Sequence, residues 1–562
     1  MAAHPASRES KMKLAKILNF SEELKGKVKK YPLLTRLAVL SLAVIYPYLC
    51  YLGGFPAMDE GVYAWTSITY NHNLASGQPL APLQGFALWP LLLAWIPDLP
   101  GLSLLWFRLA DMLAALLAGW LLCAILEKEC GVYANLLALV VLIFLTNHHV
   151  IDNGFKNSFF PAWACLFGAT YLILHEKSAG GGVWFLAGAL VASGILLRET
   201  FFPFAFLGLV AAWHKASSKG AISYILGGLP LALLVIAGLE LLAPGSLVSL
   251  YKGYADRAVI YGAQHWRILP NLISYGLRSL LLFSPALLLF LVTILWWTRF
   301  KAPENDRPSR WQITFWLCVA ILPLYEPIIK IGFYYHFAAC LPGWAFLAAL
   351  FAGQPQENFR EALQNSKKVA RMLLLLGSVA VLGTLASLPN PSNLAQTAEV
   401  LARFPDRQWP PSLVPQSTTL QVVDKINKAL PNGGTVSTNG CAFFILTAGG
   451  LTPPLSGTFD RDDNYFLSDL ARFFLNIGGD KKRMKEALLA NPPDIIVLMQ
   501  PRGSHEPSFT SELTEVLKDT GQYEKFATVD PDFPENQVTD YTWVGYDLYR
   551  HTAPTTDAFT DK

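Results

Sequence analysis

Long apolar segments dominate the first 390 residues of the chain. A helix that crosses a bilayer needs about 20 mostly apolar residues. About eleven segments approach this pattern, and they lie near 33–53, 104–126, 132–147, 158–175, 182–198, 200–213, 221–243, 275–298, 311–326, 332–352 and 371–388. The apolar segment 86–97 is shorter and is followed by prolines, which predicts a helix lying at the membrane interface.

The pattern changes near Pro389. Prolines between 389 and 415 predict a linker, and shorter strand and helix signals follow. Asp494 precedes the apolar run Ile-Ile-Val-Leu-Met, which is typical of a buried strand. Further strands are expected at 434–439 and 546–550, and helices at 465–475, 481–490 and 509–519.

These patterns predict three parts of the chain. They are a basic cytoplasmic N-terminus at 1–32, a polytopic α-helical transmembrane domain at 33–388, and a soluble extracytoplasmic α/β domain at 389–562.

Composition supports a membrane protein and excludes other classes. Of 562 residues, 53% are hydrophobic and 15% are charged, against about a quarter charged in soluble domains. This excludes an ordinary cytosolic enzyme and a disordered protein. A net charge of +3 is too small for a surface that tracks phosphates, so no nucleic-acid partner is expected. Most of the seven cysteines lie in apolar runs without zinc-site spacing, and we expect no disulfide framework.

The distribution of basic residues predicts the orientation in the cytoplasmic (inner) membrane. Lys and Arg crowd the segment before the first span and recur in alternate loops, whereas the loop 54–103 contains neither. Because cytoplasmic loops carry the excess of basic residues, the N-terminus is expected inside and the C-terminal domain outside. A full-length span follows the basic segment, so no cleavable signal peptide is expected.

Two adjacent carboxylates, Asp59 and Glu60, follow the first span. Acidic residues favour helix N-termini, so capping is one interpretation and catalysis is the other. Asp152 follows the third span in the next outer loop. The neighbouring pair His148–His149 is more typical of a solvated loop than of a metal site, because adjacent side chains point to different sides.

Ionisable residues near or inside the spans are further candidates. Arg198 and Glu199 lie between the fifth and sixth spans. There they either face a cavity or satisfy each other. Arg108 and Asp111 are three residues apart and are expected to pair on one helix face. Glu240 lies inside a span and has no partner nearby in the sequence.

The segment Asp59-Glu60-Gly-Val-Tyr63-Ala resembles the motif after the first span of GT-C glycosyltransferases, within them the protein O-mannosyltransferase and lipid A aminoarabinose transferase group. The resemblance covers roughly 33–353 in order. It continues through Ala75-Ser76-Gly77, the interfacial segment 83–96, Arg108, Asp152 and the stretch Tyr335-His336 to Pro342.

The resemblance implies an inverting membrane glycosyltransferase at the outer face. It would transfer a sugar from a polyprenyl-phosphate donor to a hydroxyl on a protein, lipid or glycan. Asp59 is implied as the general base, and Glu60 as the residue that positions Asp59 or the acceptor. Asp152 is implied as a second carboxylate on the acceptor side or as a ligand for a divalent metal. Other candidates are Arg198, Lys252, Arg257, Arg267 and Lys330 for the donor phosphate, and Tyr63, Tyr335 and His336 for substrate. For each cation, contact with lipid head groups is the alternative.

Three other functions stay open at this stage. A secondary transporter also has many spans and buried charges, but transporters usually show internal repeats, and no motif recurs between the halves. An O-antigen ligase or polymerase would use similar donors but typically places its arginines in a large late loop. A non-catalytic scaffold is the third, which the presence of both Asp59 and Asp152 disfavours.

Overall fold

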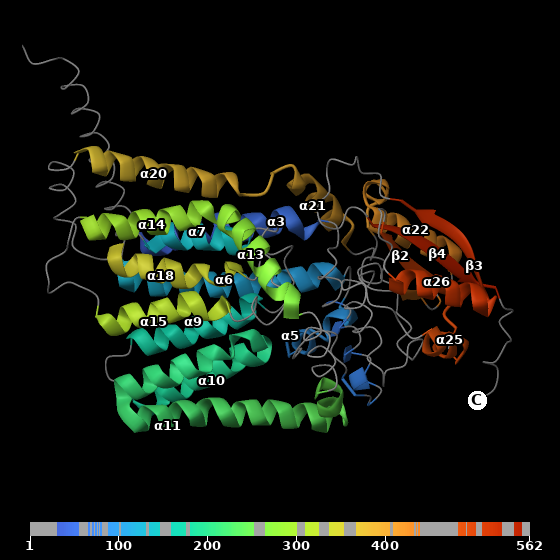
Figure 1. Ribbon diagram of the computed structural model, residues 1–562, viewed down its shortest axis with the longest axis horizontal. Coiled ribbons are helices and arrows are strands. Elements are labelled where there is room, and N and C mark those ends of the chain that lie inside the picture. Colours follow the sequence, from blue (N-terminus) through green and yellow to red (C-terminus); the bar gives the residue numbers. More distant parts are fainter. Residues whose placement is uncertain are drawn as a thin grey trace, which may run out of the picture.

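The computed structural model describes most of the chain as a helix bundle with a small sheet at one end (Figure 1). The described residues are 31–54, 64, 66, 67, 70, 71, 73–75, 77, 79, 80, 88–99, 103–130, 134–146, 159–175, 180–251, 265–299, 309–324, 337–352, 367–404, 409–431, 434, 436–438, 481–490, 492–501, 508–530 and 544–552.

The first span is continuous over Pro32–Leu52. It consists of α2 (Pro32–Leu40), a π-helical turn η1 (Ser41–Ile45) and α3 (Tyr46–Leu52). The hydroxyl of Thr146 donates to the carbonyl of Ala43 inside the π-turn, and such turns often have a side chain inserted at the widened backbone. Hydropathy therefore predicted this span with its boundaries.

The next helices also follow the predicted segments. They are α6 (Ser103–Cys130), α7 (Ala134–Thr146), α9 (Phe159–His175) and α10 (Gly181–Leu197). The predicted interfacial helix 86–97 is instead two short pieces, α5 (Leu88–Leu92) and η2 (Ile96–Asp98). Pro97 lies in the first turn of the second piece, where proline is tolerated, whereas in the interior of a longer helix its missing amide hydrogen would break the hydrogen bonding.

The helix α11 (Pro203–Leu242) is a hairpin of two arms. Ala216 and Ser217 have non-helical backbone angles and separate the arms. The hydroxyl of Tyr224 on the second arm donates to the carbonyl of Ala205 on the first, over 3.2 Å, so the arms run side by side in opposite directions. They correspond to the predicted spans 200–213 and 221–243.

The predicted span 275–298 is wrong as a continuous helix. The structure has α13 (His265–Leu282) and α14 (Ser284–Arg299), which meet at a bend of 72°. Pro285 is the second residue of α14. Proline lacks an amide hydrogen and favours the first turn of a helix, so a new helix begins there with a new direction.

The bundle is completed by α15 (Arg310–Ile321), η6 (Leu322–Leu324), α18 (Leu341–Ala352) and α20 (Lys367–Ala386). Among the described residues, three helices are long and apolar enough to cross a membrane, or four if the bent pair forms one span. Six shorter apolar helices accompany them. The structure is thus that of a helical membrane protein with a small sheet, while the number of eleven spans stays a prediction.

Helices α10 and α11 pack so closely that only glycine fits at their contact. A Cβ atom on Gly188 would lie 2.0 Å from the carbonyl oxygen of Tyr224, and one on Gly227 would lie 1.8 Å from that of Phe185. Small residues allow such backbone approach between helices in membranes.

Gly188→Ala is therefore expected to separate these helices and to destabilise the protein by about 1–3 kcal/mol. Thermal unfolding of the purified protein measures the effect. Gly182→Ala on the same helix is the control, because nothing lies within 4 Å of a Cβ there. Equal unfolding temperatures for the two variants would contradict the close packing.

The sheet has four strands in the order β1-β2-β4-β3. They are β1 (Val436–Thr438), β2 (Ile495–Pro501), β3 (Tyr523–Val529) and β4 (Val544–His551). β1 is parallel to β2, while β2–β4 and β4–β3 are antiparallel, with an irregularity between Lys525 and Ala527. The three predicted strands correspond to β1, β2 and β4, whereas β3 was not predicted from the sequence.

Helices cover both faces of the sheet. Ile495 and Val497 of β2 pack with α22 (Thr418–Ala429) on one face. Ile496 and Leu498 pack with α25 (Lys481–Ala490) and α26 (Ser508–Thr520) on the other. Because successive strand residues point to opposite faces, an uninterrupted apolar run is what this arrangement requires. Helices α25 and α26 match predictions, whereas the predicted helix 465–475 lies outside the described residues.

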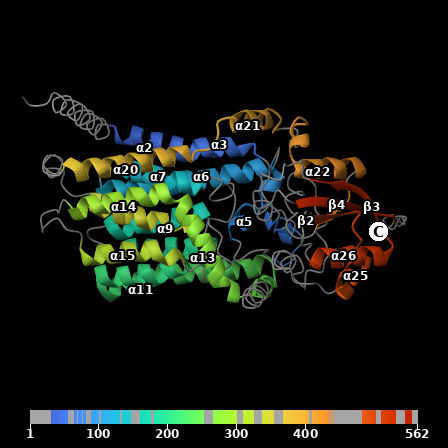
Figure 2. The same cartoon turned by 45° about the horizontal axis from the view of Figure 1, so that its top comes forward.

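The predicted linker 389–415 is in part a helix that joins the sheet to the bundle. It contains α21 (Asn393–Ala402) and is followed by η8 (Val414–Gln416). α21 lies beside α3 in both views (Figures 1 and 2). Leu52 and Leu105 of the bundle share a buried cluster with Val400 and with Val423 of α22, so the sheet is packed directly onto the bundle.

Candidate functional site

A buried arginine holds the end of the first span. Arg108 of α6 is 1% exposed, and its Nη1 donates to the carbonyls of Tyr51, Leu52 and Gly54 over 2.8 Å each. The last carbonyls of a helix lack intrahelical donors and carry partial negative charge. A guanidinium therefore satisfies both their hydrogen bonding and their charge, and it fixes the backbone that leads to Asp59.

The partners of Arg108 correct the prediction that it pairs with Asp111. Asp111 is also 1% exposed, and its carboxylate accepts a hydrogen bond from the hydroxyl of Tyr48 on α3. Both of these side chains of α6 thus contact α3. Sequence spacing shows only the neighbour on the same helix, whereas the buried contacts lie across the helix interface.

A threonine from α21 holds the same helix end from the other side. Thr397 Oγ1 donates to the carbonyl of Leu49 over 2.7 Å and accepts from the amide of Gly53 over 3.0 Å. Sequence reasoning missed Thr397. The pair Gly53-Gly54 was the available signal, since adjacent glycines indicate a turn or a close backbone contact, but such a signal does not identify the partner.

Most predicted site residues lie outside the described residues. These are Asp59, Glu60, Tyr63, Asp152, Lys252, Arg257, Lys330, Tyr335 and His336. Arg267 belongs to the helix α13, and its side chain lies outside the described part. Whether the carboxylates and cations converge therefore stays a prediction.

Arg198 is the predicted cation whose side chain the structure describes. It is 6% exposed and sits between the end of α10 and the short helix η4 (Glu199–Phe201). Its Cζ lies 5.5 Å from the ring centroid of Phe159, which is within the range of a cation–π contact. Phe159 is the first residue of α9 and follows Asp152 by seven positions in the sequence, so Arg198 lies beside the start of α9.

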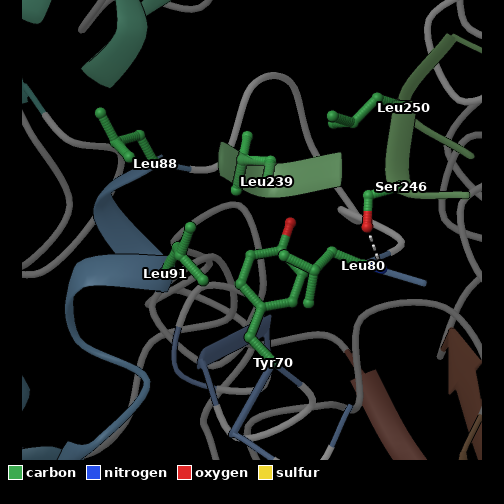
Figure 3. Close-up of a pocket in the computed structure, with 7 residues that line it drawn as sticks. All are labelled: Tyr70, Leu80, Leu88, Leu91, Leu239, Ser246 and Leu250. Atoms are coloured by element: carbon green, nitrogen blue, oxygen red, sulfur yellow. Dashed lines mark hydrogen bonds between the residues drawn. The ribbon is translucent and has the colours of Figure 1, made fainter. Parts of the chain in front are cut away.

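An apolar hollow lies where residues of the segment 64–99, which follows the first span, meet the end of α11 (Figure 3). Tyr70 and Leu91 lie on one side and Leu239 opposite them. The remaining lining residues are Leu80, Leu88, Ser246 and Leu250. The amide of Leu80 donates to Ser246 Oγ over 2.8 Å, which joins the segment after the first span to the segment after α11.

Glu240 has local partners, contrary to the prediction from sequence. Its carboxylate accepts hydrogen bonds from the amides of Gly245 and Leu247 over 2.7 and 2.9 Å. Gly245 has a φ of +87°, a conformation that glycine adopts at no steric cost, and the resulting turn brings both amides back to Glu240. Its role is therefore to cap the turn beside the hollow.

No metal site is found in the part of the chain that the structure describes. Within it, no three His, Cys, Asp or Glu side chains group closely enough to hold an ion. Asp152 and the pair His148–His149 lie outside that part. A metal ligand role for Asp152 therefore stays untested.

Of the comparisons with known proteins, the one with solved structures found a similarity. No protein-family model and no curated protein sequence matches the chain. Among solved structures, the fold is similar to that of ArnT from Cupriavidus metallidurans bound to undecaprenyl phosphate. The similarity covers 91% of this chain and 97% of that chain, with 13% sequence identity and a TM-score of 0.49. At this sequence identity and TM-score, the similarity assigns no function to this chain.

Proposed function

We propose that this protein is an integral membrane glycosyltransferase. It takes a sugar from a polyprenyl-phosphate donor, which is of the same chemical class as the undecaprenyl phosphate bound to ArnT. It transfers that sugar, with inversion, to a hydroxyl acceptor at the outer face of the cytoplasmic membrane. In this proposal the N-terminus is inside, and residues 389–562 form a domain on the outer face above the bundle.

The main observation behind this proposal is that buried side chains hold the backbone at the end of the first span, shortly before the acid pair in the sequence. The carbonyl of Gly54, which Arg108 holds, lies five residues before Asp59 in the sequence. Arg108 and Thr397 fix this backbone from two different helices. Catalytic groups need supporting residues that hold them in a productive geometry.

The proposed reaction is a single displacement at the anomeric carbon. The acceptor hydroxyl oxygen forms a bond to that carbon as the bond to the phosphate oxygen breaks, and polyprenyl phosphate leaves with the electron pair. Asp59 accepts the hydroxyl proton as general base. Glu60 orients Asp59 or the acceptor, and Tyr63 contributes to substrate binding. Attack opposite the leaving group inverts the anomeric configuration.

Cations are required to stabilise the charge that develops on the leaving phosphate. We assign this role to Arg198, with Arg257, Arg267 and Lys330 as further members of the set. The burial of Arg198 at the end of α10 supports its place in the set. A charge removed from water interacts more strongly than an exposed one, so a buried arginine is suited to a phosphate.

The hollow at Tyr70 and Leu239 is assigned to the apolar part of the substrates. Leucine side chains predominate in its lining. Its cavity volume of about 10 Å³ is close to that of one water molecule, so the hollow contacts only a small apolar group of a substrate. Tyr70, which lines the hollow, follows Glu60 of the acid pair by ten positions in the sequence.

The proposal is tested by product analysis with purified protein in lipid vesicles. The vesicles carry a panel of polyprenyl phosphates, each linked to a different sugar, and lipid, peptide and glycan acceptors are added. Mass spectrometry is expected to show a glycosylated acceptor and an equal amount of free polyprenyl phosphate for at least one donor. Movement of a donor or sugar across the vesicle membrane without product would instead support a transporter. Absence of turnover on the whole panel by folded protein would overturn the proposal.

A further inference from the structure

The C-terminal segment contacts the first span at both ends of α3. The hydroxyl of Tyr46, the first residue of α3, donates to the carbonyl of Pro389 over 2.8 Å. At the other end, Thr397 joins the carbonyl of Leu49 to the amide of Gly53 through one hydroxyl. We call the segment Pro389–Ala402, which includes α21, the strap.

The contact at Thr397 is buried and tight. Thr397 is 3% exposed. A Cβ atom added to Gly53 would lie 2.4 Å from Thr397 Cα and 2.9 Å from its nitrogen. Gly53 has a φ of −96°, which any residue adopts, so close approach is the reason that glycine is required at this position. The backbones of the strap and of the helix end are thus in direct contact.

Thr397 acts where the helix has begun to lose its own hydrogen bonds. α3 ends at Leu52, and Gly53 is the capping residue. The Thr397 hydroxyl accepts a hydrogen bond from the amide of that capping residue and donates one to a carbonyl of the last helical turn. Arg108 satisfies the neighbouring carbonyls from α6. The backbone at the end of the first span is therefore held by two side chains, one of which belongs to the strap.

We propose that Thr397 is a positioning residue for the acid pair, so that the C-terminal region takes part in catalysis through the strap. This inference rests on the proposed function, since it concerns the placement of Asp59. A displacement of about 1 Å at a catalytic group can lower a rate by about a hundredfold. We therefore expect the loss of the Thr397 hydroxyl to affect the rate of the chemical step more than substrate binding.

The test compares three substitutions at Thr397. Thr397→Val keeps the shape and removes both hydrogen bonds, Thr397→Ala leaves room for water beside the same groups, and Thr397→Ser keeps the hydroxyl. Steady-state transfer by full-length protein in lipid vesicles gives kcat and KM, normalised to the folded fraction. Thr384→Val is the matched control, because Thr384 is 1% exposed and donates to the carbonyl of Ala380 within α20.

The Val and Ala variants are expected to lower kcat about tenfold to a hundredfold, with the KM for the donor changed less than about twofold. Thr397→Ser is expected to restore kcat, and Thr384→Val to leave it unchanged. A purely structural role lowers the unfolding temperature without changing kcat per folded molecule, and that result would overturn the inference. If Thr397→Val does not fold, an unchanged kcat in Thr397→Ala overturns it equally.

The failure of this inference is distinguishable from the failure of the proposed function. If Asp59→Asn is inactive while Thr397→Val and Thr397→Ala keep the wild-type kcat, the glycosyltransferase assignment stands and the role of the strap is rejected. If the wild-type protein transfers no sugar from any donor of the panel, the proposed function itself fails.

Discussion

Asp59→Asn is expected to lower the rate of sugar transfer by about 10²–10⁴-fold, the usual contribution of general base catalysis. The amide has nearly the shape of the carboxylate but cannot accept the acceptor proton. Since the buried contacts of Arg108 and Thr397 hold the preceding helix end independently of this carboxylate, insertion and folding are expected to be unchanged. The measurement is transfer by purified variants at equal folded concentration.

Asp98→Asn is the matched control for this substitution. Asp98 is an acidic residue of the same segment between the first span and α6, and its Oδ2 accepts from the side-chain amide of Asn71 over 2.9 Å. The same chemical change at Asp98 is expected to leave the rate within about twofold, since surface substitutions away from a site have small effects. Equal rates for Asp59→Asn and the wild type would reject Asp59 as the base.

The second large effect is expected on stability, for Arg108→Ala. The change removes the guanidinium donor from three carbonyls at the end of the first span, of which that of Tyr51 still accepts from the amide of Gly54. A buried acceptor that loses its donor costs about 1–3 kcal/mol. We expect a clearly lower unfolding temperature and a loss of transfer, because the support of the acid pair is removed with the same side chain.

Two further variants separate burial from charge in this effect. Arg108→Lys keeps the charge but presents one nitrogen in place of the planar fork, so an intermediate unfolding temperature is expected. Arg550→Ala is the control, because Arg550 is exposed and also donates to a carbonyl, that of Ala429 over 3.4 Å. Similar unfolding temperatures for Arg108→Ala and Arg550→Ala would contradict the importance of the buried contact.

Much of the helical part could be predicted from sequence because each helix needs an apolar surface along its whole length. The first span and helices α6, α9 and α10 follow the predicted segments closely. The segment 275–298 failed because hydropathy averages over a window and does not register a single proline at a helix start. The strand β2 was predictable since both of its faces are covered, which requires an uninterrupted apolar run.

The contacts around the site could not be predicted in the same way. Arg108 and Asp111 suggest a pair by spacing, yet their partners come from α3, and only the packed helices determine this. The strap was predicted as a linker because prolines surround a short helix of ten residues. The carboxylates Asp59 and Asp152 were identified from a motif and remain predictions, while the contacts that hold the helix end at Leu49–Gly54 became visible only in the structure.

The most direct test of the central claim is the anomeric configuration of the product made by the wild-type protein from a polyprenyl-phosphate sugar of known configuration. Nuclear magnetic resonance of the glycosylated acceptor gives that configuration. A direct displacement assisted by Asp59 predicts a product of configuration opposite to that of the donor, formed together with one equivalent of polyprenyl phosphate. A product with the donor's configuration would contradict the proposed mechanism, and the absence of any glycosylated product would contradict the assignment of a glycosyltransferase.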